Sequence, residues 1–219
     1  RNRTMKKNEQ DISFLDHLEI LRWHLIRSGI AILILSILAF IFKEIIFDAI
    51  LLAPKDPNFL TYRFLCNISQ GLGLGDALCI KESPFSLMNI NMAGQFSTHL
   101  MTSIYAGFIL AFPYVFWEIW RFILPALKEK ETKVTRGVVF FSSLLFLTGV
   151  TFGYYVIAPL SINFLGSYQV SQTVANQISL TSFVSTVTTI SLANGIIFEL
   201  PILVYFLTKI GLLTPEFMR

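Results

Sequence analysis

The feature that most constrains how this chain can fold is the segment of residues 183–213, which is almost entirely apolar but carries one carboxylate, Glu199, near its middle. As a helix with a rise of about 1.5 Å per residue, this segment would be about 45 Å long, whereas the hydrocarbon core of a bilayer is about 30 Å thick. The segment is therefore expected to span a membrane. An acidic side chain at the bilayer centre costs about 2.5–3.5 kcal/mol on insertion scales, so Glu199 is expected to face protein or trapped water.

The residues around Glu199 suggest what it meets. Pro201 has no N–H to bond the carbonyl group of Ile197, which predicts a kink and a free polar group there. Counted at about 3.6 residues per turn, Thr188 and Gly195 lie on the same face as Glu199, and small residues let another helix approach closely. Two interpretations remain: a structural polar contact inside a helix bundle, or a contact site for a partner helix formed by Glu199, Pro201, Thr188 and Gly195.

The composition is that of an integral membrane protein. Hydrophobic residues make up 54% of the chain and charged residues only 14%, against about 25% charged in ordinary soluble domains. No block of basic residues resembles a nucleic-acid patch, so we expect no nucleic-acid partner. The sequence has no phosphate-binding glycine loop and no hydrolase signature, and its three histidines are scattered. We therefore expect neither an enzyme nor a cofactor or metal site.

The apolar segments predict an all-α protein, a polytopic bundle with four membrane spans. The expected spans are residues 25–52, 98–123, 137–165 and 182–213. Residues 1–24 are expected to form a polar tail followed by a short amphipathic helix at the membrane interface. The connections are then residues 53–97, 124–136 and 166–181, with a short end at 214–219.

The positive charges predict the orientation of the spans. Of the 17 lysines and arginines, 13 lie within residues 1–27, 121–136 and 209–219, at or near the ends of the spans. Loops rich in lysine and arginine stay in the cytoplasm, so both termini are expected there. The 53–97 and 166–181 connections are then extracytoplasmic.

Both cysteines, Cys66 and Cys79, lie in the 53–97 connection, which this topology places on the oxidising side of the membrane. Two cysteines in one such loop are suited to a disulfide, and closing a loop of about 14 residues could contribute about 3 kcal/mol in the chain-entropy model. The alternative is that they are two unpaired thiols packed as small apolar groups.

Four short stretches, in order along the chain, form a pattern. The first is residues 17–22, which read His-Leu-Glu-Ile-Leu-Arg. The other three are Ala53-Pro54, Pro113 followed by residues 120–127 and Glu131, and residues 198–201, which read Phe-Glu-Leu-Pro. Together they resemble the TatC family, the multispanning receptor subunit of the twin-arginine protein translocase, which opens with a His-Leu-x-Glu-Leu-Arg signature. The resemblance covers residue 13 to the end of the chain.

This resemblance implies a glove-like, concave bundle in the bacterial inner (plasma) membrane that transports folded proteins without the Sec system. Its cytoplasmic face would bind twin-arginine signal peptides through Glu131, with Phe122 and Arg22 nearby. Glu199 would meet the helix of a small single-span partner of the TatA or TatB type, in a translocon driven by the proton-motive force. The expected partners are thus signal peptides, TatA/TatB-type proteins, the lipid bilayer and further copies of this chain. Pro54, Pro113 and Pro125 would be structural positions.

Two departures from the family pattern matter. The family glutamate before Leu-Arg falls on Ile20 here, so we hypothesise that Glu19 or Asp16 supplies the second negative charge of the signal-peptide site. The family has six spans and this chain shows four, from which we expect a chain that is incomplete at its C-terminal end. The alternative function is a proton- or ion-coupled small-molecule transporter that uses a membrane-buried carboxylate. Such a transporter would take up its substrate without partner proteins.

Overall fold

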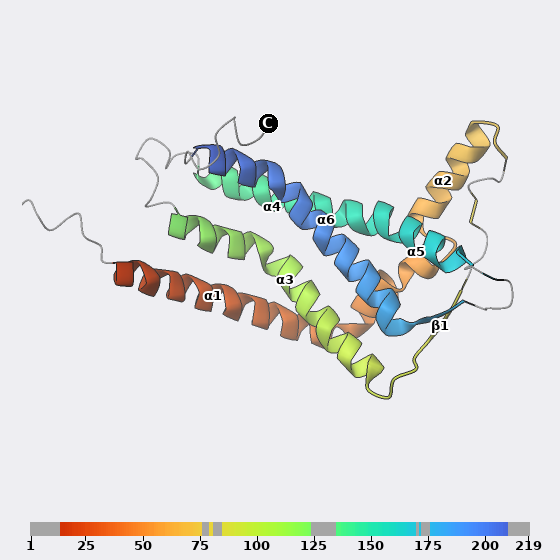
Figure 1. Cartoon of the computed structure of the whole chain (residues 1–219), viewed down its shortest axis with the longest axis horizontal. Coiled ribbons are helices and arrows are strands. Elements are labelled where there is room, and N and C mark those ends of the chain that lie inside the picture. The colour runs from red at the N-terminus through yellow and green to blue at the C-terminus, as the bar shows by residue number, and fades with distance from the viewer. Residues whose placement is uncertain are drawn as a thin grey trace, which may run out of the picture.

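The computed structural model describes residues 14–75, 79–80, 85–123, 135–169, 171 and 176–209 of the chain. Its long helices are α1 (Phe14–Ile41), α3 (Gly94–Ile123), α4 (Thr135–Phe152) and α6 (Leu180–Lys209). A π-helical turn, η5 (Gly153–Ile157), and α5 (Ala158–Ser167) continue α4. Four helical stretches of the described chain are long and apolar enough to cross a membrane: Glu19–Ile41, Gly94–Ile123, Gly137–Ser167 and Leu180–Tyr205. The predicted four-span, all-α bundle is confirmed (Figure 1).

The first helix differs from the sequence expectation of a separate interfacial helix followed by a span over residues 25–52. Helix α1 runs without a break from Phe14 to Ile41, and a π-helix, η1 (Ile45–Leu51), follows it. The physical reason is that no proline occurs between residues 14 and 41, so nothing removes a hydrogen bond from this helix. The amphipathic segment is therefore the first part of α1 itself.

The connection between the first two spans is also more ordered than a polar loop. It contains a short 3-10 turn, η2 (Ala53–Lys55), the helix α2 (Leu60–Gly71) and the strand β1 (Ser86–Met88). Strand β1 pairs in parallel with β2 (Gln177–Ser179), which precedes α6, with Leu87 opposite Ile178. The two connections at this end of the bundle are thus joined by backbone hydrogen bonds.

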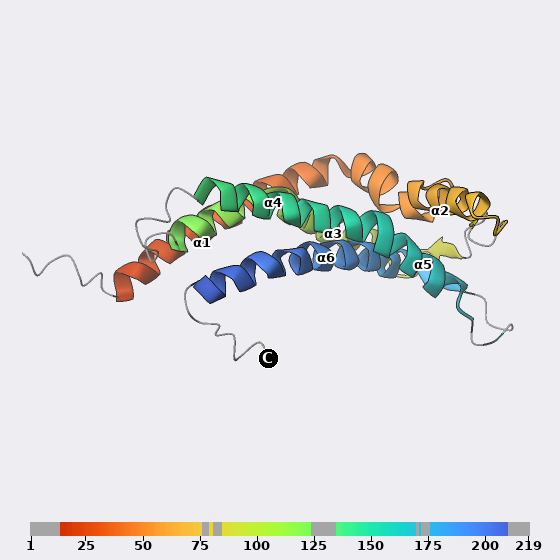
Figure 2. The ribbon, with the colours of Figure 1, turned by 90° about the horizontal axis from the view of Figure 1, so that it is seen from above.

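The bundle consists of two helix pairs, α1 with α3 and α4 with α6, and α3 also contacts both α4 and α6. Figure 2 shows that the spans are bowed rather than straight, which gives the bundle a concave side. Glycines allow the close approaches within each pair. A Cβ atom at Gly107 of α3 would lie 2.6 Å from the backbone nitrogen of Ser36 in α1, and one at Gly149 of α4 would lie 2.7 Å from the carbonyl oxygen of Asn194 in α6.

One end of the bundle is closed by covalent and apolar contacts; we call it the disulfide end. Cys66 and Cys79 form a disulfide there with a Cα–Cα distance of 4.4 Å, which confirms the predicted bridge. The hydroxyl group of Tyr62, in α2, donates to the carbonyl oxygen of Pro54 at 2.9 Å and lies 3.1 Å from that of Pro159. Burial raises the pKa of Tyr62 to about 12, so this hydroxyl keeps its proton at neutral pH.

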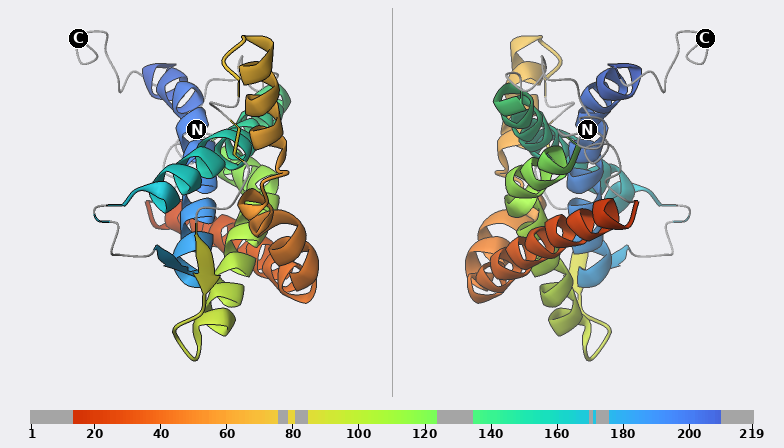
Figure 3. Two further views of the ribbon diagram at one scale, coloured as in Figure 1. Left: turned by 90° about the vertical axis from the view of Figure 1, so that its right-hand side faces the viewer. Right: turned by 90° about the vertical axis from the view of Figure 1, so that its left-hand side faces the viewer.

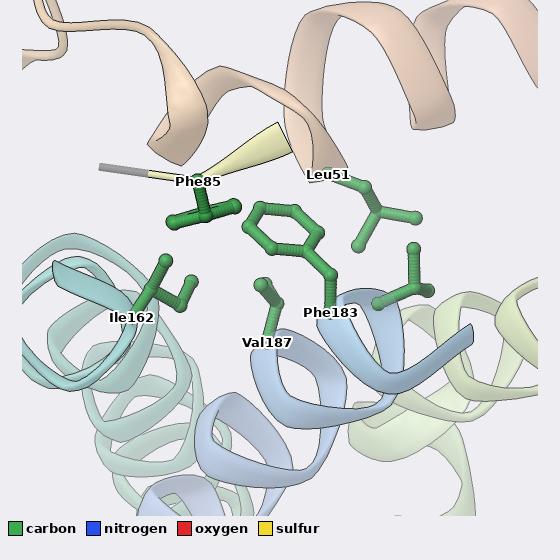
Figure 4. Packing of buried hydrophobic residues seen from close by; sticks show 6 residues of the cluster. Leu51, Phe85, Ile162, Phe183 and Val187 are labelled. Atoms are coloured by element: carbon green, nitrogen blue, oxygen red, sulfur yellow. The ribbon is translucent and has the colours of Figure 1, made fainter. Parts of the chain in front are cut away.

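A buried apolar cluster holds the disulfide end to the spans (Figure 4). Phe183, in the first turn of α6, points from its helix toward Phe85, just before β1, and Leu51, the last residue of η1. Ile162 of α5 and Val187 of α6 complete the contact. The cluster therefore joins four segments that lie far apart in the sequence.

The close approach of α1 and α3 gives a prediction for stability. Gly107→Ala should lower the free energy of unfolding by about 1–3 kcal/mol, because the added methyl group meets backbone atoms of Ser36 and forces the helices apart. Gly29→Ala, in α1, is the matched control: no atom lies within 4 Å of its added Cβ. It should leave stability unchanged or raise it by up to about 1 kcal/mol. Thermal unfolding in detergent measures both, and an equal effect of the two variants would contradict this packing.

Candidate functional site

The N-terminal end of the bundle, opposite the disulfide end, is where α1 begins, α3 ends, α4 begins and α6 ends (Figure 1). Among the described residues its most buried charged group is Glu118 of α3, which is only 1% exposed. The Nδ1–H of His24, in α1, donates to Oε2 of Glu118. The hydroxyl of Tyr114 donates to Oε1 at 3.0 Å. Both carboxylate oxygens thus have a donor.

Arginine and aromatic side chains surround this carboxylate. Arg121 places Nη1 3.9 Å from Oε1 of Glu118, and its guanidinium carbon lies 5.0 Å from the ring centroid of Trp117. The ring of Phe122 meets that of His24 edge to face, with centroids 6.2 Å apart. The last turns of α3 are therefore fixed against α1, which gives Phe122 a defined position relative to the first turns of α1.

The structure brings together several of the predicted signal-peptide residues at this end. Glu19 and Arg22 are exposed on α1, about one turn before His24, and Phe122 is partly buried beside His24. Asp16 belongs to α1, but its side chain lies outside the described part of the chain, as do Glu131 and Pro125 altogether. The segment that carries Glu131 joins α3 to α4, and the described ends of both helices lie at the N-terminal end of the bundle.

Glu199, in α6, has a different environment from Glu118. The hydroxyl of Ser142, in α4, donates to Oε2 of Glu199 at 2.6 Å. Oε1 is also buried, but it has no hydrogen-bond partner among the described residues. Helix α6 continues through Pro201, which is exposed, to Lys209. Among the described residues, only one of the two carboxylate oxygens of Glu199 is therefore hydrogen-bonded.

The small residues near Glu199 do not all face a partner helix. Gly195 is buried, and a Cβ atom there would lie 2.7 Å from Cγ2 of Val150, so this face of α6 is already covered by α4 of the same chain. Thr188 is buried too, and its hydroxyl donates to the carbonyl oxygen of Val184 at 2.8 Å. Gly195 therefore packs against α4 of the same chain, and the partner-helix contact predicted there stays a prediction.

A cavity of about 390 Å³ opens between η1, α3, η5 and α6. Its lining is mostly apolar and includes hydroxyl groups of Thr102, Tyr105, Thr188 and Ser191, with no charged side chain. Thr188 therefore faces this cavity, whereas Glu199 is not part of it. The described residues contain no group of three or more His, Cys, Asp or Glu side chains that could hold a metal ion.

The comparisons with known proteins agree with this architecture. The model of the family "Sec-independent protein translocase protein (TatC)" matches residues 16–219. A Sec-independent protein translocase protein TatC from Blattabacterium sp. subsp. Periplaneta americana is 36% identical over 216 residues, which are 98% of this chain and 81% of the relative. This chain belongs to the TatC family.

Solved TatC structures share the fold as well. The crystal structure of a twin-arginine translocase receptor, TatC, superposes with a TM-score of 0.72 at 32% sequence identity, covering 92% of this chain and 78% of that one. A TatC relative from Aquifex aeolicus is 34% identical over 202 residues, 92% of this chain and 74% of the relative. This TatC chain is thus a multi-pass membrane protein and a component of a protein translocase.

Sequence reasoning missed the pair of Glu118 and His24 in this TatC chain. Neither residue is marked as a site by its own part of the sequence, since Glu118 lies near the end of an apolar segment and His24 is one of three scattered histidines. One signal was present: Glu118 is an acid flanked by aromatic residues at the end of an apolar helix, where it needs a partner. The identity of that partner, 94 residues away, depends on how α1 and α3 pack.

The buried pair gives a prediction for this TatC chain. Glu118→Ala should lower the free energy of unfolding by about 3 kcal/mol, because it removes a fully buried carboxylate that accepts hydrogen bonds from both His24 and Tyr114 and ties α1 to α3. Glu118→Gln should cost less, since its amide oxygen still accepts a hydrogen bond. Glu19→Ala is the exposed control and should change stability by no more than about 0.5 kcal/mol. Equal thermal stability of Glu118→Ala and Glu19→Ala in detergent would show that the pair is dispensable.

Proposed function

We propose that this chain is the receptor of a twin-arginine translocase, which binds twin-arginine signal peptides at its N-terminal end and nucleates a translocon driven by the proton-motive force. The proposal rests on one observation. Glu19, Arg22 and Phe122 lie at the same end of the bundle, which also holds the hydrogen-bonded pair of His24 and Glu118. Membership of the TatC family and the likeness to a solved twin-arginine translocase receptor support it.

The chemistry of the signal suggests the roles of these residues. Two adjacent arginines present two planar guanidinium groups, which are best met by carboxylates that accept paired hydrogen bonds. Glu131 is the first candidate, although Lys128, Lys130 and Lys133 surround it in the sequence. A second acid is therefore needed to keep the local potential negative. The exposed Glu19, or Asp16, would supply it.

The disulfide supports an orientation for this receptor. Disulfides persist in oxidising compartments, and the bridge between Cys66 and Cys79 lies at the end opposite the start of α1. In a bacterial plasma membrane the disulfide end would face outward and the N-terminal end would face the cytoplasm. This orientation presents Glu19 to a signal peptide before export.

Signal-peptide binding by the purified, detergent-solubilised protein tests the proposal. A twin-arginine signal peptide should bind, and the same peptide with both arginines replaced by lysines should not, because an ammonium group cannot form the paired bonds. Glu131→Lys should abolish binding and Glu19→Gln should weaken it by about fivefold, the loss of one exposed charge contact of about 1 kcal/mol. Binding should also weaken with added salt.

The matched control is Glu44→Gln, the same kind of substitution as Glu19→Gln at an exposed acid near the disulfide end. It should leave the affinity unchanged. If neither Glu131→Lys nor Glu19→Gln changes the affinity, the assignment of the site is wrong. Equal binding of the arginine and lysine peptides would overturn the receptor function itself.

A second part of the proposal concerns Glu199 and single-span partners of the TatA or TatB type. Its Oε1 atom is buried and has no hydrogen-bond partner in the part of the chain that the structure describes, and its Oε2 atom accepts a hydrogen bond from Ser142. A polar side chain on a partner helix would complete the hydrogen bonding at this position, and the cost of leaving it incomplete would favour association within the membrane.

Cross-linking in the membrane between α6 and the partner helix tests this contact. Glu199→Gln should keep most of the cross-link, because glutamine still offers a donor and an acceptor, whereas Glu199→Ala should reduce it by about fivefold or more, the effect of losing a hydrogen bond of about 1 kcal/mol. Thr189→Ala, at an exposed polar position of the same helix, should have no effect. If Gln and Ala reduce the cross-link equally, the hydrogen bond is not what holds the partner.

A further inference from the structure

We propose that α2 is a membrane-interface anchor, with one face of the helix immersed in the lipid boundary at the disulfide end of the bundle. This inference concerns the end opposite Glu19, so it holds whether or not the proposed signal-peptide residues bind signal peptides. Helix α2 lies outside the four candidate spans and runs across their direction, as Figures 1 and 3 show. It is therefore placed as a helix lying along the membrane surface would be.

One face of α2 is apolar and exposed. Leu60, Phe64, Ile68 and Leu72 follow each other at intervals of four, so on a helix they form a continuous stripe, each rotated by about 40° from the last. Phe64 is 63% exposed and Leu72, which directly follows the helix, is 69% exposed. Exposing such a row of large apolar side chains to water is unfavourable, so the row marks an interaction surface.

Of the other two faces of α2, one is buried against the protein and the other is polar and exposed. Tyr62 and Ser69 are buried and point to the protein, where Tyr62 bonds the carbonyl oxygen of Pro54 and Ser69 bonds that of Gly75 at 2.8 Å. Three exposed polar side chains form the remaining face: Arg63, Asn67 and Gln70. A helix with an apolar, a polar and a protein-bound face fits the boundary between lipid and water, at the edge of a bundle.

The apolar stripe continues the lipid-facing surface of a span. The hydroxyl of Thr61, within the stripe, donates to the carbonyl oxygen of Tyr155 in η5, and Phe59 stacks on the Tyr155 ring at 5.6 Å. Tyr155 is 38% exposed and borders a shallow hollow with Leu147 and Phe152, on a span whose exposed apolar side chains lipid must cover. Tyrosines are typical of the level where lipid tails meet headgroups. Because the apolar stripe of α2 continues the lipid-facing surface of this span, we infer that lipid covers the stripe.

Depth-dependent quenching on the full chain in nanodiscs, at one chain per disc, tests the proposal. Phe64→Cys is labelled with a bimane fluorophore, and non-reducing mass analysis confirms that the bridge between Cys66 and Cys79 is intact. Arg63→Cys, the neighbouring residue on the polar face, is the matched control. Lipids brominated near the headgroup end of their acyl chains should quench the label at position 64 at least about threefold more than at position 63, and aqueous iodide should show the opposite order, as expected for a helix lying at the interface.

The other outcomes each overturn the proposal. Strong iodide quenching at both positions would mean that the stripe faces water. A label at position 64 that neither quencher reaches at one chain per disc would mean that protein covers the stripe. Protection from both quenchers only at several chains per disc would mean that a second copy, rather than lipid, is its occupant.

Discussion

The absence of water in the bilayer core is the constraint on which this structure depends, because every polar group there needs a partner from the protein. The hydroxyl groups of the spans meet this requirement locally. Ser103 donates to the carbonyl oxygen of His99, Thr151 to that of Leu147 and Ser191 to that of Val187, each one helical turn back. Such bonds allow many Ser and Thr residues in the spans without requiring contacts between helices.

Carboxylates cannot be satisfied in this way, and Glu118 and Glu199 differ in how their oxygens are hydrogen-bonded. Glu118 receives donors on both oxygens, from His24 and Tyr114, and so ties α1 to α3. Glu199 receives one donor, from Ser142, and keeps one buried oxygen without a partner among the described residues. A fully satisfied buried network stiffens a structure, whereas a half-satisfied one is costly unless something completes it. This contrast separates an acid whose hydrogen bonding is complete within the described residues from one whose hydrogen bonding is not.

The two ends of the bundle are built by different interactions, and this division fits a receptor. At the disulfide end, the bridge, the paired strands and the cluster around Phe183 join segments that lie far apart in the sequence. At the N-terminal end, α1 and α3 are held together by the hydrogen bond between His24 and Glu118 and by the ring contact of His24 with Phe122. Glu19 and Arg22 are exposed at this end. The disulfide end holds the segments of the bundle together, and the N-terminal end presents charged side chains on helices whose positions are fixed. Binding surfaces benefit from such preorganisation because less freedom is lost on association.

The sequence by itself determined the four spans, the placement of an acid within the last one and the placement of both cysteines in one connection, because these follow from apolar length, a single charge in an apolar run and topology. It also contained the motifs that place the chain in its family. The tertiary structure alone decided that His24 meets Glu118, that α4 covers Gly195 and that α2 forms within the first connection with an exposed apolar stripe. Local patterns define each helix and its faces, but a contact between residues 94 positions apart depends on which helices pack together and in what register. That choice is made by the shapes and polar groups of several helices at once, which no single segment of the sequence records.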